Sequence, residues 1–216
     1  MDPALLRTLL SLPGTRRELV AMAKLFDAKD TVVRFGADAT ERALKSDRSV
    51  DRAEVLVFAT HGLLPRELGG LEEPALVLTP PSAATAIDDG VLTASEVAQL
   101  SLTAEWVILS ACNTAGGDTA DGGESLSGLS RAFLYAGARA VLASHWRVQD
   151  DVTAALTVQT LQARRDQPGL GKADALQLAM RAVRTGTGVD GQPIPGWKPA
   201  WALPSAWAPF VVVETR

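Results

Sequence analysis

The sequence is poor in the side chains that most often carry nucleophilic or metal chemistry. Cys112 is the single cysteine, and His61 and His145 are the two histidines. A single cysteine excludes an internal disulfide and a zinc site built from several thiolates, and it favours a reducing compartment. Any chemistry that pairs a thiol with an imidazole must therefore use Cys112 and one of two partners.

Long apolar runs and an excess of positive charge are also absent. No stretch approaches the roughly 18–20 apolar residues that span a bilayer. The start, MDPALLRTLLSLPG, lacks the basic region and cleavage site of a secretory signal. The formal net charge of −4 gives no general electrostatic reason to bind nucleic acid or an anionic membrane. We therefore expect a cytoplasmic, soluble protein without nucleic-acid or membrane partners.

What the sequence does contain is enough apolar material for a sizeable core, with 47% hydrophobic residues among 216. Strand-like apolar runs alternate with helical patterns along the chain. The expected strands are 31–35, 54–60, 74–80, 106–111, 138–144 and 208–214. Capping boxes formed by Thr15 with Glu18 and by Thr93 with Glu96 each predict the start of a helix. Further helices are expected at 40–46, with Thr40 as its cap, and at 125–138, 151–165 and 172–184. This alternation predicts an α/β sandwich with a mostly parallel sheet.

Two of the expected strands end in reactive side chains. His61 follows a buried strand in FATHG, and Cys112 follows another in LSACNT. If these strands are parallel neighbours, imidazole and thiol emerge at one edge of the sheet, where the histidine can take the thiol proton. Gly62 and the glycines after Cys112 let backbone amides approach an oxyanion. The alternative is a small buried cysteine and an ordinary loop histidine.

Several segments also carry a family resemblance. In order, they are VLVFATHG, GVLTASEVAQLSL, WVILSACNTAGG, GESLSGLSRAFLYAGARAVLASHWRVQDD and SAWAPFVVV. Together they resemble the motifs of the CHAT domain, a caspase-like family related to separase. The resemblance implies a caspase-hemoglobinase fold, a three-layer α/β sandwich with a mostly parallel central sheet flanked by helices. It implies His61 as general base, Cys112 as nucleophile, and an oxyanion hole from the backbone amides of Gly62 and Cys112. No metal or organic cofactor is needed for that chemistry.

Two features depart from the family pattern. CHAT chains normally carry another core strand before the LPGT segment, together with a sensor region such as tetratricopeptide repeats, or a partner protein. We therefore expect residues 1–216 to form one peptidase domain without that strand and without the sensor region. The second departure is His145, which stands where the family more often has an apolar residue. It is a rival base on chemistry alone, and we expect it at the wall or rim of the substrate pocket.

The segment SHWRVQDD is expected near the cysteine and to set substrate preference. Trp146 can form an apolar wall, and Asp150 or Asp151 can place a carboxylate at the base of a pocket for a cationic side chain. The resemblance to separase then implies cleavage after Arg or Lys. The alternative is that either aspartate serves only to cap the helix that begins there. Further candidate acids in the glycine-rich loop after Cys112 are Asp118, Asp121 and Glu124.

Three tryptophans near the end of the chain remain. We expect Trp197 and Trp201 to line a substrate groove and Trp207 to anchor the last strand. The whole pattern predicts a cysteine endopeptidase acting on a specific protein substrate. By analogy with bacterial relatives, its role would lie in regulated proteolysis such as defence or cell death. The alternative is a catalytically silent caspase-like scaffold that works by binding a partner.

Overall fold

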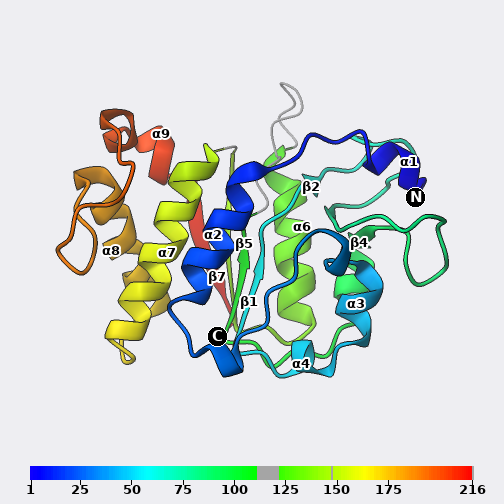
Figure 1. Ribbon diagram of the computed structural model, residues 1–216, viewed down its shortest axis with the longest axis horizontal. Helices are drawn as coiled ribbons and strands as arrows, with labels where there is room; N and C mark the ends of the chain where they lie inside the picture. Colours follow the sequence, from blue (N-terminus) through cyan, green and yellow to red (C-terminus); the bar gives the residue numbers. More distant parts are fainter. Residues whose placement is uncertain (111–121, 147, 216) are drawn as a thin grey trace. The chain divides into compact units, whose positions relative to one another are not determined.

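A computed structural model describes residues 1–110, 122–146 and 148–215 (Figure 1). The chain forms two compact units. The first unit comprises Met1–Leu12, Arg34–Arg147 and Val213–Arg216, and the second comprises Pro13–Val33 and Val148–Val212.

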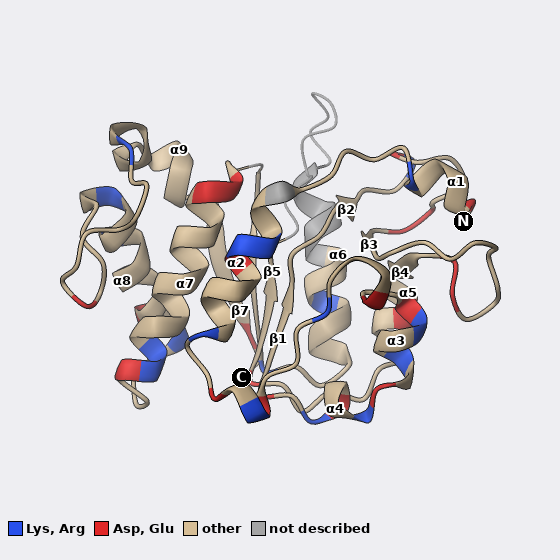
Figure 2. Ribbon diagram, viewed as in Figure 1, with Lys and Arg blue, Asp and Glu red and all other residues tan. Residues whose placement is uncertain are grey.

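The central sheet has four strands in the order β1-β5-β6-β7. Their bounds are β1 Val55–Phe58, β5 Trp106–Leu109, β6 Ala140–Ser144 and β7 Phe210–Glu214. β5 runs parallel to both β1 and β6. β5 and β6 are buried along their whole length, which explains their unbroken apolar runs. β1, β5 and β6 contain no charged residue, and Figure 2 shows β1 and β5 in tan. The predicted α/β class with a mostly parallel central sheet is confirmed.

The helices of the first unit are mostly short. They are α1 Pro3–Leu6, α3 Glu41–Ser46, α4 Arg48–Asp51, α5 Ala94–Val97 and α6 Gly122–Tyr135, with a 3-10 turn at Gly36–Asp38. The predicted cap of α3 is present, because the Thr40 side chain accepts a hydrogen bond from the Ala43 N–H at 3.1 Å. The predicted box at Thr93 and Glu96 also has both of its hydrogen bonds.

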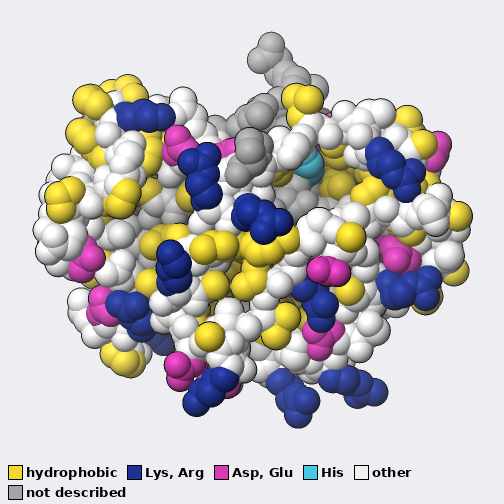
Figure 3. Space-filling model, viewed as in Figure 1, with side chains coloured by type: hydrophobic (Ala, Val, Ile, Leu, Met, Phe, Trp, Pro, Cys, Tyr) yellow, Lys and Arg dark blue, Asp and Glu magenta, His cyan; other side chains and the backbone are white. Residues whose placement is uncertain are grey.

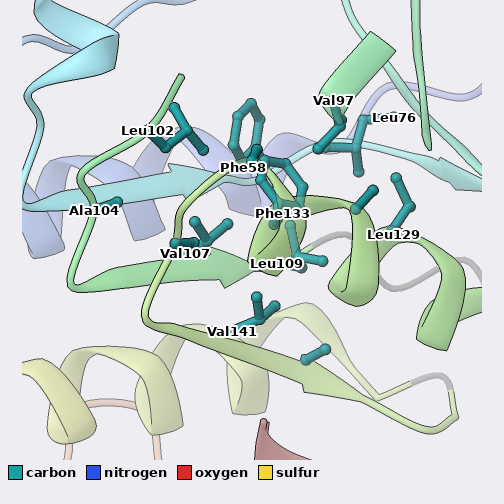
Figure 4. Close-up of a cluster of buried hydrophobic side chains, with 14 of the residues drawn as sticks. Phe58, Leu76, Val97, Leu102, Ala104, Val107, Leu109, Leu129, Phe133 and Val141 are labelled. Carbon is teal, nitrogen blue, oxygen red and sulfur yellow. The ribbon is translucent and has the colours of Figure 1, made fainter. Parts of the chain in front are cut away.

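The core of the first unit lies between α6, α5 and the central strands. Val107 and Leu109 of β5 belong to this cluster, together with Val141 of β6 (Figure 4). Phe58 and Phe133 pack at its centre, with ring centroids 5.3 Å apart and planes tilted by 41°. The end of β1 is therefore held by an aromatic contact with α6.

A second, smaller sheet was not expected. It consists of β2 Gly62–Leu63, β3 Ala75–Val77 and β4 Val91–Thr93, paired antiparallel in that order. The strand expected at 74–80 belongs here and is shorter than its apolar run, because prolines bound it on both sides.

A buried carboxylate supports the turn that leads into β4. Glu41 Oε2 accepts the backbone N–H groups of Asp89 at 2.8 Å and Gly90 at 3.2 Å. Lys45 Nζ lies 2.5 Å from Glu41 and 2.8 Å from Glu96, so one ammonium joins two carboxylates. Burial raises the pKa of Glu41 despite these bonds. The turn that precedes β4 is therefore fixed to α3 by polar contacts.

The second unit is helical over most of its length. Its elements are α2 Pro13–Ala23, a 3-10 turn at Ala28–Asp30, α7 Asp150–Asp166, α8 Lys172–Thr185, a 3-10 turn at Pro199–Ala202 and α9 Pro204–Trp207. α7 packs against both α2 and α8. In the α2–α7 contact, Thr157 Oγ1 donates a hydrogen bond to the buried Glu18 carboxylate at 3.2 Å.

Two expectations about secondary structure are wrong. α2 begins at Pro13, so Thr15 lies inside the helix and does not form a capping box with Glu18, which faces α7. Proline suits the first helical position, because its missing N–H would be unpaired there in any case. Residues 31–35 have extended backbone at Thr31 and Phe35 but belong to no strand of the described sheets. Strand propensity alone is insufficient where no neighbouring strand completes a ladder.

Candidate active site

Along the chain, His61 lies between a strand of the central sheet and the first strand of the small sheet. It follows β1 and directly precedes β2. Its carbonyl accepts the Val77 N–H at 2.8 Å, and the Thr60 hydroxyl donates to the Val77 carbonyl. The backbone at His61 is therefore fixed to β3, while its side chain remains half-buried. Figure 3 shows a histidine side chain in cyan at the surface, with hydrophobic side chains next to it.

Within the described part of the chain, a hydrogen bond of the His61 imidazole fixes its tautomer. Nε2 lies 2.7 Å from the carbonyl oxygen of Leu10. A carbonyl oxygen can only accept, so Nε2 carries the proton and donates it. In the neutral ring the lone pair is then on Nδ1, which is the nitrogen able to accept a proton. Sequence patterns gave no signal for this contact, because it uses the backbone of Leu10 and leaves its side chain exposed.

The parallel pairing puts the carboxyl ends of three strands at one edge of the central sheet. Phe58 at the end of β1 pairs with Leu109 at the end of β5. β5 pairs with β6 through Val107 opposite Val141 and Ile108 opposite Leu142. In a sheet of this kind, ligands gather at the carboxyl edge. His61 follows Phe58 by three residues (61 − 58), so it belongs to this edge.

The proposed nucleophile cannot be placed beside it. Cys112 follows Leu109 by three residues (112 − 109) and lies in 111–121, outside the described residues. The predicted proximity of Cys112 and His61, and the predicted oxyanion role of the Cys112 amide, therefore stay predictions. The other predicted amide belongs to Gly62, which is buried in β2 opposite Leu76.

Comparison with models of known protein families finds a match over nearly the whole chain. The sequence model of the CHAT domain matches residues 4–215. The chain belongs to the CHAT domain family. This family is related to the caspase-like cysteine peptidases. A search of curated proteins found no match to the chain.

In this CHAT domain, the two residues predicted for the wall and rim of a pocket follow β6 directly. His145 and Trp146 are both exposed, and 45% of Trp146 is accessible to solvent. Tryptophan side chains are usually largely buried, so an exposed indole at the carboxyl edge of a buried strand is unusual. The role of Trp146 and His145 as wall and rim of a pocket stays a prediction.

Asp150 and Asp151 occupy the first turn of α7 in the second unit. Neither is the N-cap residue, which is Gln149, so the predicted alternative of a side-chain cap does not hold. Asp151 pairs with Lys198 at 3.2 Å in an exposed ion pair. Asp150 packs against the start of α2, where a Cβ built on Gly14 would lie 3.1 Å from its own Cβ.

The other candidate acids divide between two parts of the chain. Asp118 and Asp121 lie outside the described residues. Glu124 was expected in the glycine-rich loop, but it belongs to α6, which begins at Gly122. The helix starts three residues earlier than its apolar pattern suggested, since glycine and glutamate at its first positions carry no periodic signal.

The tryptophans of the second unit have mainly structural contacts. Trp201 is 2% exposed and belongs to the core, so the expectation that it lines a substrate groove is wrong. Trp197 is half-buried over Gly186, and its Nε1–H donates to the Val183 carbonyl at 2.7 Å. Trp207 Nε1 lies 3.4 Å from the carbonyl of Ala202. The sequence of this loop did not indicate which of its tryptophan side chains would be buried.

Within the part of the chain that the structure describes, no group of three or more His, Cys, Asp or Glu side chains could hold a metal ion. Within the same part, no helix is long and apolar enough to cross a membrane.

Proposed function

We propose that this CHAT domain is a cysteine endopeptidase in which His61 is the base and Cys112 the nucleophile. The observation that carries the proposal is the hydrogen bond from His61 Nε2 to the Leu10 carbonyl, because it leaves Nδ1 free to accept a proton. β1 and β5 are parallel neighbours with Phe58 opposite Leu109, and the same number of residues separates each strand end from His61 and from Cys112. Family membership supports the same dyad.

The reaction then follows from the properties of the two groups. Nδ1 of His61 accepts the proton of the Cys112 thiol, and the thiolate attacks the carbonyl carbon of the scissile peptide bond. The C–N bond breaks, and the imidazolium returns the proton to the departing amine, leaving a thioester on Cys112. His61 next takes a proton from water, whose oxygen attacks the thioester. The carboxylic acid product leaves as the S–C bond breaks, and the proton returns to the thiolate.

Backbone amides would stabilise the oxyanion of each tetrahedral intermediate. We assign this role to the N–H groups of Gly62 and Cys112, as the family resemblance implies. Gly62 suits it because it lacks a Cβ and directly follows His61 in a strand fixed to β3. Removing one such donor typically costs about 10²–10³ in kcat.

Cleavage after Arg or Lys is the second part of the proposal. A carboxylate in a pocket selects strongly for a cationic side chain. Of the two aspartates, Asp150 is the better candidate, since Asp151 is already paired with Lys198. We further propose Trp146 and His145, four and five positions before Asp150, as the wall and rim of that pocket. The substrate would be a specific protein, recognised with the help of a sensor region or partner protein.

Covalent trapping tests the nucleophile and the cationic preference together. A peptide chloromethyl ketone with Arg at P1 should label Cys112, as located by mass spectrometry, and a matching Asp chloromethyl ketone should not. Fluorogenic peptides ending in Arg or Lys should be cleaved by the wild type and not by Cys112→Ala.

The pocket acid is tested by charge reversal. Asp150→Lys should abolish labelling by the Arg reagent, while Asp174→Lys, in the equivalent first turn of α8, should not. Loss of labelling with Asp151→Lys instead would reassign the acid to Asp151. No cleavage and no labelling by the wild type, with its natural partner present, would favour the scaffold function over the peptidase.

A further inference from the structure

The segment from Pro3 to Leu10, called here the N-terminal strap, connects the small sheet to His61. Its anchor is Leu6, which is 3% exposed and packs in a cluster with Leu63, Val77 and Val91. The fit is close, since a Cβ built on Gly90 would lie 2.9 Å from Leu6 Cδ1. Figure 1 shows the chain running from α1 on past β2. The far end of the strap is the Leu10 carbonyl at His61.

The link between Leu6 and Leu10 is short and internally bonded. The N–H groups of Thr8 and Leu9 donate to the carbonyls of Leu5 and Leu6 at 3.0 and 3.2 Å. The Arg7 guanidinium donates to the Pro81 carbonyl, which ties the link to the loop before β4. Consecutive Cα atoms are about 3.8 Å apart, so a bonded link of this length leaves the Leu10 carbonyl little freedom once Leu6 is in place.

The two ends of the strap also contact one short stretch of chain. His61 receives the hydrogen bond from the strap, and Leu63, two residues later, is 1% exposed in the cluster that holds Leu6. His61, whose ring is oriented by the strap, and Leu63, which packs with the anchor Leu6, are thus only two residues apart in the chain. Movement of Leu6 out of the cluster would draw the Leu10 carbonyl away from Nε2.

We propose that Leu6 and Leu10 are positioning residues, and that the seating of Leu6 in the small-sheet cluster holds the His61 ring in the tautomer and orientation of a base. The consequence for catalysis rests on the proposed peptidase function. The coupling of Leu6 to the His61 ring does not, because it is a property of the free protein. Release or seating of the strap would accordingly change the turnover of the site without changing the residues that contact substrate.

The hydrogen bond itself supplies a direct measurement. A ring N–H that is hydrogen-bonded to protein exchanges with water more slowly than one facing solvent. In a His145→Gln background, His61 is the single histidine, so its ring ¹⁵N and N–H signals need no further assignment. We expect Leu6→Ala to accelerate solvent exchange of the Nε2–H by about fivefold to tenfold, the factor that loss of one hydrogen bond implies. Leu5→Ala, at the exposed neighbouring position, should leave the exchange rate unchanged.

A second variant keeps the test valid if Leu6→Ala fails to fold. Insertion of two glycines between Thr8 and Leu9 leaves the anchor seated but breaks the rigid link to Leu10. It should accelerate the same exchange by a similar factor. Unchanged exchange in a folded Leu6→Ala protein, or in the insertion variant, would overturn the coupling and leave Leu6 as an ordinary core residue of the small sheet.

Kinetics separate the strap from the peptidase proposal. With the Arg peptide, Leu6→Ala and the insertion should lower kcat by about tenfold, as expected for a displaced catalytic group, with KM nearly unchanged. Altered exchange with no cleavage by the wild type would support the coupling and reject the peptidase. If the His61 ring N–H of a variant exchanges faster with water but its kcat is normal, the positioning role is rejected. The peptidase proposal is unaffected by that result.

Discussion

At the scale of single residues, the candidate site depends on a histidine whose environment is largely backbone. His61 is fixed by its own carbonyl, which accepts from Val77, and by its ring, which donates to Leu10. The position of the histidine could be predicted from the FATHG motif. Its tautomer could not, since the acceptor is a carbonyl 51 positions earlier (61 − 10) and any side chain can supply one.

The choice of base between the two histidines is therefore testable by exchange to glutamine. Glutamine at position 61 keeps an N–H donor for the Leu10 carbonyl but offers no comparable base, so His61→Gln should lower kcat/KM for Arg peptides by about 10²–10⁴. His145→Gln should alter KM and leave kcat nearly unchanged, because this ring is exposed at the end of β6. The reverse result in steady-state kinetics would transfer the role of base to His145.

Asp47 is a second residue whose role depends on its local contacts. It caps α4 by accepting the Ser49 N–H at 2.9 Å, and Arg34 donates to it at 2.5 Å. The hydrogen bonds from Ser49, and then that from Arg34, lower the pKa of Asp47 from 3.8 to about 2. A lowered pKa stabilises the folded state above the unfolded value of 3.8, and this contribution disappears as the pH falls towards 2.

We therefore expect Asp47→Asn to reduce the stability measured by urea denaturation above pH 4, with the difference from the wild type shrinking between pH 4 and 2. Asp38→Asn, at an exposed position in the same unit, should follow the wild-type curve throughout. A constant difference between Asp47→Asn and wild type at all pH values would contradict the assignment to ionised Asp47.

At the scale of elements, the parallel pairing of β1 with β5 matters most for the site. Their unbroken apolar runs indicated buried strands, and buried parallel strands end at a common edge. The apolar pattern did not indicate that β3 belongs to the small sheet, because a short apolar run is typical of a strand in either sheet. The small sheet forms from residues that are local in sequence, and it is the support for His61 and for the strap.

The end of α6 provides the sharpest prediction at this scale. Gly137 has a φ of +111°, and a Cβ there would lie 2.2 Å from the Leu102 carbonyl oxygen. Gly137→Ala should therefore lower the free energy of unfolding by about 2–5 kcal/mol, from backbone strain and overpacking combined. Gly69→Ala, where nothing lies within 4 Å, is the control and should change it by less than about 0.5 kcal/mol. A similar effect of the two changes in thermal denaturation would disprove the close approach.

At the scale of the whole molecule, the chain divides into two compact units, each with its own buried apolar residues. The first unit contains most of the central sheet, the small sheet and His61, and the second contains α2, α7 and α8. The expectation of one peptidase domain stays a prediction. The family match over residues 4–215 includes residues of both units.

The stability of the first unit should depend most on Phe133. Its side chain is fully buried and contacts Phe58, while the neighbouring Tyr135 on the same helix is 82% exposed. Phe133→Ala should lower the free energy of unfolding by about 3–5 kcal/mol through lost burial and the cavity left behind. Tyr135→Ala should change it by less than about 0.5 kcal/mol. Equal urea midpoints for the two variants would show that this cluster is not the core of the unit.

The sequence by itself determined the α/β class and the two capped helices at Thr40 and Thr93, and it proposed the dyad, which stays a prediction. Each depends on a local pattern in the sequence. These patterns are the periodicity of apolar residues, the spacing of capping residues, and a reactive residue directly after an apolar strand. Only the tertiary structure decided that Trp201 is core, that Asp151 is paired, and that the Leu10 carbonyl orients His61. These depend on contacts between residues far apart in the chain, and no short-range preference encodes which distant backbone group will face a given side chain.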